Sequence, residues 1–255
     1  MSAKIRINRY LATAGFGSRR KCEELITSGL VSVNGKTLLS LASSIDPNVD
    51  SITVGGRPIS KMDAARLLVL RKPVGVLSTV KDSFGRKTVI DIAKEHGYTE
   101  RLFPVGRLDL NTSGILILTN DGDLAYRLTH PRFKIEKTYR VTIGGALSEE
   151  VIAKITSGID LNGYATRPCE ITIIAHGVAT TTLEVLLREG RKRQIRRMFA
   201  AFGYKVIDLE RTALGDLAFD DLAPGVMRPL TEREECRLRE LAGLTREGKE
   251  KSACQ

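Results

Sequence analysis

One segment near the middle of the chain places a single carboxylate directly before an apolar run. The segment is Gly106-Arg107-Leu108-Asp109-Leu110-Asn111-Thr112-Ser113-Gly114, and Ile115-Leu116-Ile117-Leu118-Thr119 follows it. A short apolar run bounded by turn-forming residues is typical of a buried β-strand. We therefore expect Asp109 at the edge of a core, partly removed from water and close to the cation of Arg107. Such a carboxylate suits a nucleophile or a base, although aspartate is also a common turn residue.

The same residues match the first half of a calcium-binding loop, because oxygen-bearing side chains alternate from Asp109 to Ser113 before Gly114. That loop needs a bidentate glutamate at its twelfth position, where this chain has Asn120, so the calcium interpretation fails. The four cysteines and three histidines are scattered without the spacing of a metal site. We therefore expect no metal ion, and reduced cysteines in the cytoplasm.

Charge is the unusual property of the composition. The 255 residues carry a net charge of +10, which points toward a polyanionic partner. Half of that excess lies in residues 1–61, which hold nine Lys or Arg against four acids. No apolar run approaches the length of a membrane-spanning helix, so we expect no membrane partner.

The N-terminal region has its own predicted elements. A helix begins at Ile7, Ser18 can cap a second helix, and Asn34-Gly35 predicts a tight hairpin turn. The first turn of the second helix carries Arg19, Arg20 and Lys21, where cations oppose the helix dipole by roughly 0.3–1 kcal/mol each. A phosphate backbone across this helix start would reverse that cost, which favours phosphate binding over a merely solvated basic helix.

A denser basic cluster occupies residues 188–199, with six cations and one acid. Ile195, Met198, Phe199 and Phe202 recur at helical spacing, so the segment predicts an amphipathic helix with its apolar stripe inward. Cations at 193, 196 and 197 flank that stripe. A guanidinium beside a buried face needs an anion, either a phosphate or an internal carboxylate; a surface helix with extended arginines is the alternative.

The rest of the chain is expected to be rich in strands with interspersed helices. Strands are predicted from Leu67, over 137–143, and near 159–161, 169–174 and 180–187. The strand over 137–143 puts Tyr139 on its apolar face. Helices are predicted from Val89, after Asp121, and after a capping box at 231–234.

Two family resemblances organise these observations. Residues 7–38 resemble the small alpha-L RNA-binding domain, through Ala14-Gly15-Phe16-Gly17-Ser18-Arg19-Arg20 and Gly29-Leu30-Val31-Ser32-Val33-Asn34-Gly35. Residues 67–231 resemble the ribosomal RNA pseudouridine synthases, in the branch whose members modify small-subunit or large-subunit RNA. The matching motifs include Lys72-Pro73-x-Gly75, the Asp109 segment, Lys137-Thr138-Tyr139 and the basic cluster.

The resemblances imply an α+β fold in two domains. We expect an RNA-binding domain at 1–62, a linker at 63–66, a catalytic domain at 67–243 and a disordered tail at 244–255. The catalytic domain would hold a bisected, mixed or antiparallel sheet flanked by helices, with a cleft across its middle. The family uses no cofactor.

Site roles follow from the resemblance position by position. The catalytic aspartate falls on Asp109, its aromatic partner on Tyr139, and the arginine that would hold the carboxylate in a bidentate pair on Arg196. Ile195 matches an aliphatic residue that packs near the target base. RNA-binding roles are expected for the surrounding cations, which are Arg107, Arg193, Arg191, Arg197, Lys72, Arg86, Arg19, Arg20 and Lys21.

Two positions depart from the common family pattern. Arg71 and Lys192 stand where family members often carry asparagine. Both change local charge, and neither removes a catalytic group. The departures therefore leave the expected activity intact and affect only the details of the RNA site.

The implied function is isomerisation of a uridine in ribosomal RNA to pseudouridine by a monomeric enzyme, with large-subunit RNA preferred as target. The RNA partner would be free ribosomal RNA or an assembling ribosomal particle. Alternatives are the same chemistry on small-subunit RNA and a noncatalytic assembly factor that uses the same basic surfaces. A DNA-binding helix-turn-helix over 7–29 is disfavoured, because a hairpin signal follows instead of a third helix.

Overall fold

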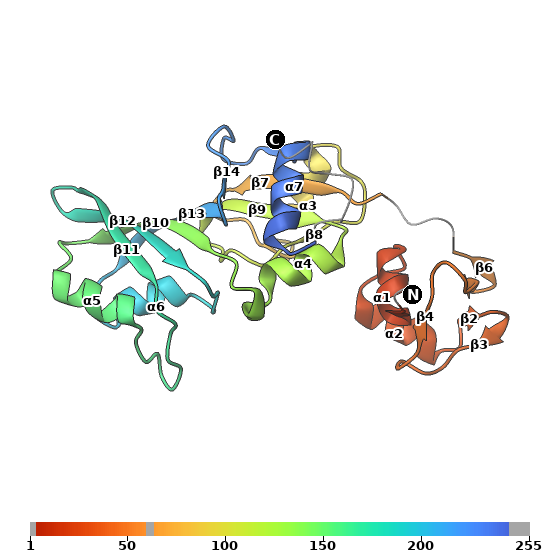
Figure 1. Cartoon of the computed structure of the whole chain (residues 1–255). Helices are drawn as coiled ribbons and strands as arrows, with labels where there is room; N and C mark the ends of the chain where they lie inside the picture. Colours follow the sequence, from red (N-terminus) through yellow and green to blue (C-terminus); the bar gives the residue numbers. More distant parts are fainter. Residues whose placement is uncertain (1–3, 60–63, 245–255) are drawn as a thin grey trace. The chain divides into compact units, whose positions relative to one another are not determined.

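The computed structural model describes residues 4–59 and 64–244, which fall into two compact units with their boundary between Ala65 and Arg66 (Figure 1). Each unit is described by itself. The expected linker at 63–66 spans this boundary, and its residue 63 lies outside the described residues. The expected tail also lies outside them from residue 245 onward.

The first unit pairs two helices with short strands. Ser18 caps the second helix by accepting from the Lys21 amide, and Asn34-Gly35 makes the predicted turn with both φ angles positive. Ile7, Leu11 and Ile26 are fully buried in its core. The elements are β1 (Ile5–Arg6), α1 (Ile7–Thr13), α2 (Arg19–Thr27), β2 (Val31–Val33), β3 (Lys36–Thr37), β4 (Ser44–Ile45), β5 (Ile52–Val54) and β6 (Arg57–Pro58).

The second unit is built on a nine-stranded mixed sheet. Its main path runs β11-β12-β10-β13-β9-β7-β15, with β14 beside β13 and β8 beside β9. All neighbours are antiparallel except β13 and β9. The strands are β7 (Leu67–Lys72), β8 (Phe103–Pro104), β9 (Ser113–Thr119), β10 (Lys137–Gly144), β11 (Glu170–His176), β12 (Thr180–Leu187), β13 (Val206–Leu214), β14 (Leu217–Ala218) and β15 (Met227–Pro229). The expected α+β fold with a bisected mixed sheet is confirmed.

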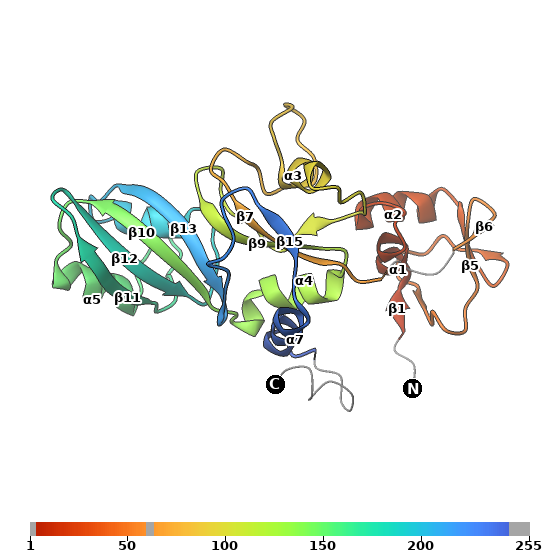
Figure 2. The same ribbon diagram turned by 90° about the horizontal axis from the view of Figure 1, so that it is seen from above.

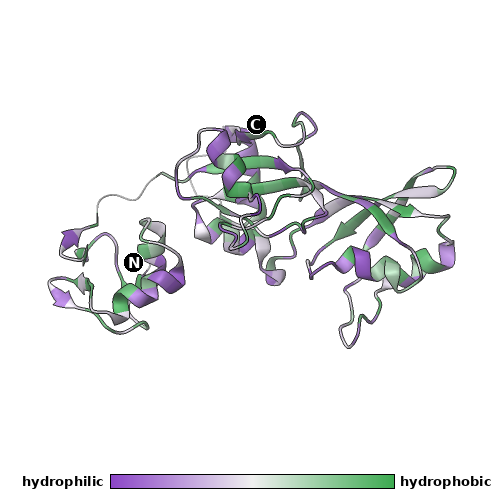
Figure 3. Cartoon of the chain, turned by 180° about the vertical axis from the view of Figure 1, so that it is seen from behind, coloured by the Kyte–Doolittle hydropathy of each residue, from purple (hydrophilic) through white to green (hydrophobic). Residues whose placement is uncertain are grey.

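Helices cover the sheet on both faces. Figure 2 shows α3 on one side of β7 and β9, with α4 and α7 on the other. Successive side chains of β7 point to opposite faces of the sheet. Leu68 and Leu70 therefore pack with residues of α3, whereas Leu67 and Val69 pack with residues of α4 and α7. Figure 3 shows green, apolar strands beneath helices with purple outer faces. The helices are α3 (Val89–Glu95), α4 (Gly122–Thr129), η1 (Pro131–Phe133), α5 (Glu149–Ser157), α6 (Gln194–Ala200) and α7 (Glu232–Leu241).

The two halves of the sheet meet where β9 begins. Two residue pairs join β13 to β9, namely Glu210 with Ser113 and Arg211 with Gly114. A Cβ at Gly114 would lie 2.2 Å from the Arg211 carbonyl oxygen, and its φ of +105° also favours glycine. This glycine therefore permits the close approach of the two half-sheets, five residues after Asp109.

The structure corrects two sequence expectations and adds one helix. Residues 159–161 form no strand, only an isolated bridge between Asp160 and Ala165, and helix α5 was not anticipated although Ser148 caps it. Cys22 and Cys169 are free and buried, whereas Cys236 is disulfide-bonded, contrary to the expectation of reduced cysteines.

None of the helices in the described residues has the length and apolar character needed to span a membrane.

Candidate active site

The loop that carries Asp109 is fixed by hydrogen bonds to its backbone groups. The Ser78 hydroxyl donates to the Leu108 carbonyl at 2.9 Å and accepts from the Leu108 amide at 3.1 Å. The Thr112 amide donates to the Asp109 carbonyl at 3.0 Å, closing the predicted turn before β9. Asp109 is half-buried in this loop, so its carboxylate is presented from a rigid edge of the sheet.

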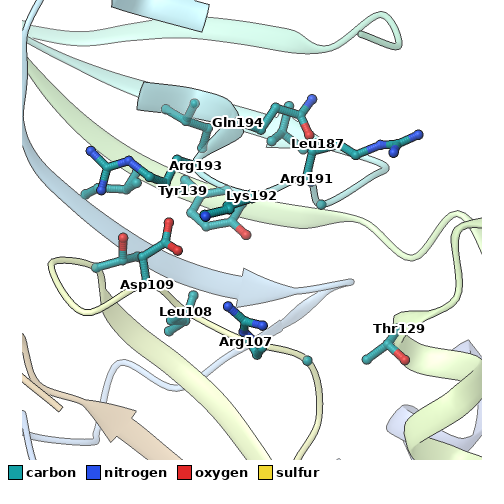
Figure 4. A pocket seen from close by; sticks show the side chains of 15 residues that line it. Arg107, Leu108, Asp109, Thr129, Tyr139, Leu187, Arg191, Lys192, Arg193 and Gln194 are labelled. Carbon is teal, nitrogen blue, oxygen red and sulfur yellow. Dashed lines mark hydrogen bonds between the residues drawn. The ribbon is translucent and has the colours of Figure 1, made fainter. Parts of the chain in front are cut away.

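Asp109 opens onto a cavity of about 400 Å³ at the junction of the two half-sheets (Figure 4). This volume lies within the usual range for ligand pockets. Figure 4 shows Asp109 and Arg107 on one side, residues of the basic cluster on the other, and Thr129 at one end. The cavity is lined by Gly106, Arg107, Leu108, Asp109, Thr112, Thr129, Tyr139, Leu187, Gly190, Arg191, Lys192, Arg193, Gln194, Ile195 and Leu209.

Tyr139 contributes from the middle of β10. Its ring packs in the main core and is 9% exposed, while the residue also lines the cavity. The predicted alternation is confirmed, because Val141 and Ile143 are buried on the same face and Arg140 is exposed on the other. Tyr139 thus presents its ring to the cavity from a fixed strand position.

Arg196 does not make the bidentate pair with Asp109 that we expected. Its guanidinium donates to the backbone carbonyls of Asn111 and Val206, and within the described part of the chain no ion pair joins it to Asp109. Burial and Arg193 lower the pKa of Arg196, while the charge of Asp109 opposes this shift. The side chain therefore holds the turn beside Asp109 and places a positive charge near it, without contacting the carboxylate directly.

A buried carboxylate organises the basic loop between β12 and α6. Glu189 is 5% exposed and accepts from the Arg167 amide at 3.0 Å, the Gln194 amide group at 2.6 Å and the Tyr164 hydroxyl. Burial acts to raise the pKa of Glu189, but these hydrogen bonds outweigh it and lower the value. Gln194 in turn accepts from the Arg191 amide. This network fixes the loop that presents its cations to the cavity.

The cations of that loop are held in defined positions. The Arg191 guanidinium lies 3.9 Å from the centre of the Tyr164 ring, which is a cation–π contact. Arg193 precedes α6 with a φ of +53°, a left-handed conformation that is uncommon for a residue with a side chain. The predicted helix follows as α6, with Ile195, Met198 and Phe199 buried.

Lys72 lies beneath the site rather than at its surface. It is fully buried, and its ammonium donates to the Pro73 and Val76 carbonyls at 2.8 Å each. Burial lowers the pKa of Lys72 to about 8, with a smaller opposing effect from Asp109. The expectation that Lys72 contacts RNA is therefore corrected, because a side chain without exposed surface cannot reach a phosphate.

Other expected RNA-binding residues are not among the residues that line the cavity. The Arg197 guanidinium donates to the Leu161 carbonyl at 2.8 Å. Arg86 is held by Asp82 at 2.7 Å, and this bond lowers the pKa of Asp82 to about 2. The α2 cations Arg19, Arg20 and Lys21 are exposed on the first unit. Of the expected set, Arg107, Asp109, Tyr139, Arg191, Arg193 and Ile195 share the cavity.

Several lining residues were not anticipated. Thr112 is 2% exposed, and its hydroxyl has no protein partner among the described residues. Thr129 and Gln194 were given no role in the site, and Lys192 was noted only as a departure from the family pattern. Ser78, which clamps the Asp109 loop from a segment thirty residues earlier, carried no sequence signal.

The site offers one carboxylate, one phenol and several cations around one cavity. Among residues 4–59 and 64–244, no three His, Cys, Asp or Glu side chains gather closely enough to hold a metal ion. The arrangement suits nucleophilic or acid–base chemistry on an anionic ligand, with the cations holding that ligand.

Comparisons with known proteins identify the family of the chain. Residues 66–201 match the RNA pseudouridylate synthase family, and residues 5–50 match the S4 domain. An uncharacterised RNA pseudouridine synthase of Aquifex aeolicus is 40% identical over 94% of this chain and 96% of its own length. Ribosomal large subunit pseudouridine synthase B of Bacillus subtilis is also 40% identical, over 93% of this chain and 96% of its own.

A solved structure is similar as well. The crystal structure of a pseudouridylate synthase superposes with a TM-score of 0.65 and 29% identity, covering 93% of this chain and 99% of that one. The fold, the family match over more than half of the chain and the full-length relatives agree. The chain belongs to the RNA pseudouridylate synthase family and carries an N-terminal S4 domain.

Proposed function

We propose that this RNA pseudouridine synthase isomerises one specific uridine of large-subunit ribosomal RNA, with Asp109 as its catalytic carboxylate. The large-subunit target is supported by the similarity to the Bacillus subtilis synthase B. The role of Asp109 is supported by its fixed loop and by the cavity that it shares with Tyr139 and Ile195. The single observation that carries the proposal is this carboxylate at the junction of the two half-sheets.

The reaction is an isomerisation that needs no oxidant or reductant. The bond between N1 of uracil and C1′ of the ribose breaks, the base rotates, and a bond between C5 and C1′ forms. C5 then loses its proton, and N1 regains one. An ionised carboxylate can begin the reaction either by attacking C1′ or by taking a proton from the sugar. Asp109 serves in both routes.

The neighbouring side chains take supporting roles. Tyr139 offers a ring face to the base and a phenolic oxygen for proton transfer, and Ile195 offers an apolar contact to the base. Arg196 acts on the Asp109 loop through its bond to the Asn111 carbonyl. It is therefore proposed as a positioning residue that also contributes positive charge near the carboxylate.

RNA is held by cations on both units. Arg107, Arg191 and Arg193 line the cavity, and the α2 cations offer phosphate contacts on the S4 domain. Removing the target base from its stack costs a few kcal/mol, which phosphate contacts can offset. We propose that the protein acts as a monomer in the cytoplasm, on ribosomal RNA or an assembling ribosomal particle, without a cofactor.

Two other functions make different predictions. The same chemistry on small-subunit RNA would place the modified uridine in the other transcript. A noncatalytic assembly factor would bind RNA through the same cations and modify nothing. The cavity with Asp109 and Tyr139 favours the enzyme, because binding alone requires neither group.

The test is to map pseudouridines in both large ribosomal RNAs from strains with and without the gene. We expect one large-subunit site to disappear and to return with the wild-type gene. It should not return with Asp109→Asn, which keeps the shape but removes the charge, although the purified variant should bind RNA within about twofold of wild type. In vitro the variant should lose at least about a thousandfold in rate.

The outcomes separate the alternatives. Loss of a small-subunit site would move the target to the other RNA. Unchanged maps in both RNAs would favour the assembly factor. A normal rate for Asp109→Asn would remove the carboxylate from the mechanism.

A further inference from the structure

A second cavity adjoins the first and is strongly basic. Its volume is about 110 Å³, and Gly106, Arg107, Thr129, Tyr139 and Gly190 line both cavities. It extends from Tyr139 toward the end of α4, where His130 and Lys134 are exposed at its edge. The charged residues of its lining are Arg107, Lys134, Lys137, Arg188, Glu189 and Arg211.

Two of these cations stand on the same sheet face as Tyr139. Lys137 is two residues before Tyr139 on β10, so the two side chains share a face. Arg211 pairs directly with Tyr139 across β13, which also puts their side chains on one face. The strands therefore place two positive charges immediately beside the proposed catalytic tyrosine.

These two cations lack carboxylate partners within the described residues. Arg211 is 4% exposed and donates from Nε to the Ile115 carbonyl at 2.7 Å. The Lys137 ammonium donates to the Ile135 carbonyl at 2.5 Å. Burial, and then the charge of Arg211, lower the pKa of Lys137 to about 8. A buried cation beside a half-buried one is costly to a fold unless an anion joins them.

Two other charged groups of the cavity, Arg188 and Glu189, are already engaged. Arg188 pairs with Glu136 at 2.7 Å and Glu170 at 2.8 Å. Glu189, the one acid in the lining, is held by Tyr164, the Arg167 amide and Gln194. No charged side chain of the lining thus neutralises Lys137 and Arg211, which leaves room for an external oxyanion.

We propose that this cavity binds a phosphate oxyanion of the RNA backbone next to the target nucleotide, with Lys137 and Arg211 as its ligands. The proposal rests on the proposed function for the identity of the RNA. Its position follows from the lining shared with the first cavity, since a nucleotide bound beside Asp109 carries phosphates on both sides of its ribose. The two cations would be retained for this contact despite their cost to stability.

Lys137→Met tests the assignment, because methionine keeps much of the volume and removes the charge. The probes are in vitro transcripts of both large ribosomal RNAs, with Kd measured by filter binding between about 50 and 200 mM salt. We expect Kd to rise about tenfold and the slope of log Kd against log salt to fall by about one. Lys137→Arg should keep the slope, and the thermal midpoint of Lys137→Met should rise, which loss of a purely structural lysine would not cause.

The matched control is Lys154→Met on α5, where the lysine is exposed and paired with Glu150. Its Kd should stay within about twofold of wild type. The same Kd and slope for Lys137→Met as for wild type would overturn the proposal. If Lys137→Met does not fold, Kd and its salt slope are measured on Lys137→Gln, which also removes the charge but keeps a polar side chain.

Inorganic phosphate separates the two sources of the oxyanion. Phosphate could raise the thermal midpoint of the wild type but not that of Lys137→Met, while both proteins bind RNA with the same Kd. That result would assign the cavity to free phosphate and overturn the RNA contact. Failure of the proposed function is a different result. Weaker RNA binding by Lys137→Met, with no pseudouridine formed by the wild type, would support the contact and reject the reaction.

Discussion

The two basic clusters of this protein are built in different ways. At the start of α2, Arg19, Arg20 and Lys21 are exposed, and Lys21 pairs with Glu24 on the same helix. The loop at 189–194 is instead organised by the buried carboxylate of Glu189. Exposed charge attracts a polyanion without fixing its position, whereas a hydrogen-bonded loop fixes where each cation lies.

This difference suggests a division of labour within the family fold. The S4 domain contributes affinity for RNA, and the loop of the second unit contributes the geometry of the site. Substitutions in the first cluster should therefore change Kd and its salt dependence. Substitutions in the second should change the rate at saturating RNA. Three experiments test this difference between the two clusters.

The largest effect is expected from Glu189→Ala. The substitution leaves the Gln194 and Tyr164 side chains and the Arg167 amide without their acceptor, and each unsatisfied buried donor costs about 1–3 kcal/mol. We expect the free energy of unfolding to fall by about 2–4 kcal/mol and the rate at saturating RNA to fall by about 10- to 100-fold. Urea unfolding and single-turnover kinetics measure the two effects.

Glu170→Ala is the matched control, because that glutamate is exposed and pairs with Arg188 across the neighbouring strand. Its rate should be close to wild type. A wild-type rate for Glu189→Ala would mean that the loop does not depend on the buried carboxylate, and the contrast between the clusters would fail.

A smaller effect is expected from replacing Arg19, Arg20 and Lys21 together with serine. We expect about a tenfold weaker Kd and a salt slope reduced by up to about three, with an unchanged rate at saturating RNA. Stability should be equal or slightly higher, because each cation removed from a first helical turn relieves roughly 0.3–1 kcal/mol. Filter binding across a salt series measures the change.

The charge-preserving variant with Arg19→Lys, Arg20→Lys and Lys21→Arg provides the comparison for that experiment. It should bind RNA nearly as well as wild type if charge alone matters. A fall in the rate at saturating RNA for the serine variant would show that the first cluster also shapes the site.

The smallest effect is a pH dependence that only the second unit should show. The pKa values of Lys72 and Lys137 are lowered to about 8, so from about pH 8 the folded state binds fewer protons than the unfolded state. Stability should therefore rise from pH 8 to 9, by about 1–2 kcal/mol. Above pH 9, the raised pKa of Cys169, about 11, acts in the opposite direction.

Urea unfolding at several pH values in this window checks the sign. Lys137→Met should reduce the rise by about half, because one of the two lysines no longer titrates. Stability that falls between pH 8 and 9 would contradict the burial of both ammonium groups.

Local signals in the sequence predicted much of the fold. The apolar run after Asp109 is β9, the Asn34-Gly35 hairpin and the Ser18 cap are as expected, and α6 buries all of the predicted stripe except Phe202, which follows the helix. Each of these depends on residues close together in the chain. Helix α5 was missed even though Ser148 and two following glutamates mark its start.

Long-range contacts could not be predicted in the same way. The Arg196 bond to the Asn111 carbonyl spans 85 residues, whereas the family resemblance had paired Arg196 with the Asp109 carboxylate. The Ser78 clamp and the Glu189 bond to Tyr164 also join distant segments. Lys72 was expected to bind RNA as one of the cations around the site, whereas its place in β7, between β9 and β15, buries it.

The most direct measurement is a crystal structure of the protein bound to an RNA that contains its target uridine. We predict that the target nucleotide lies outside its stack in the larger cavity, with an Asp109 oxygen about 3–3.5 Å from C1′ of the ribose or from its neighbouring carbon. An Asp109 side chain directed into solvent, with the target base bound elsewhere, would contradict the account.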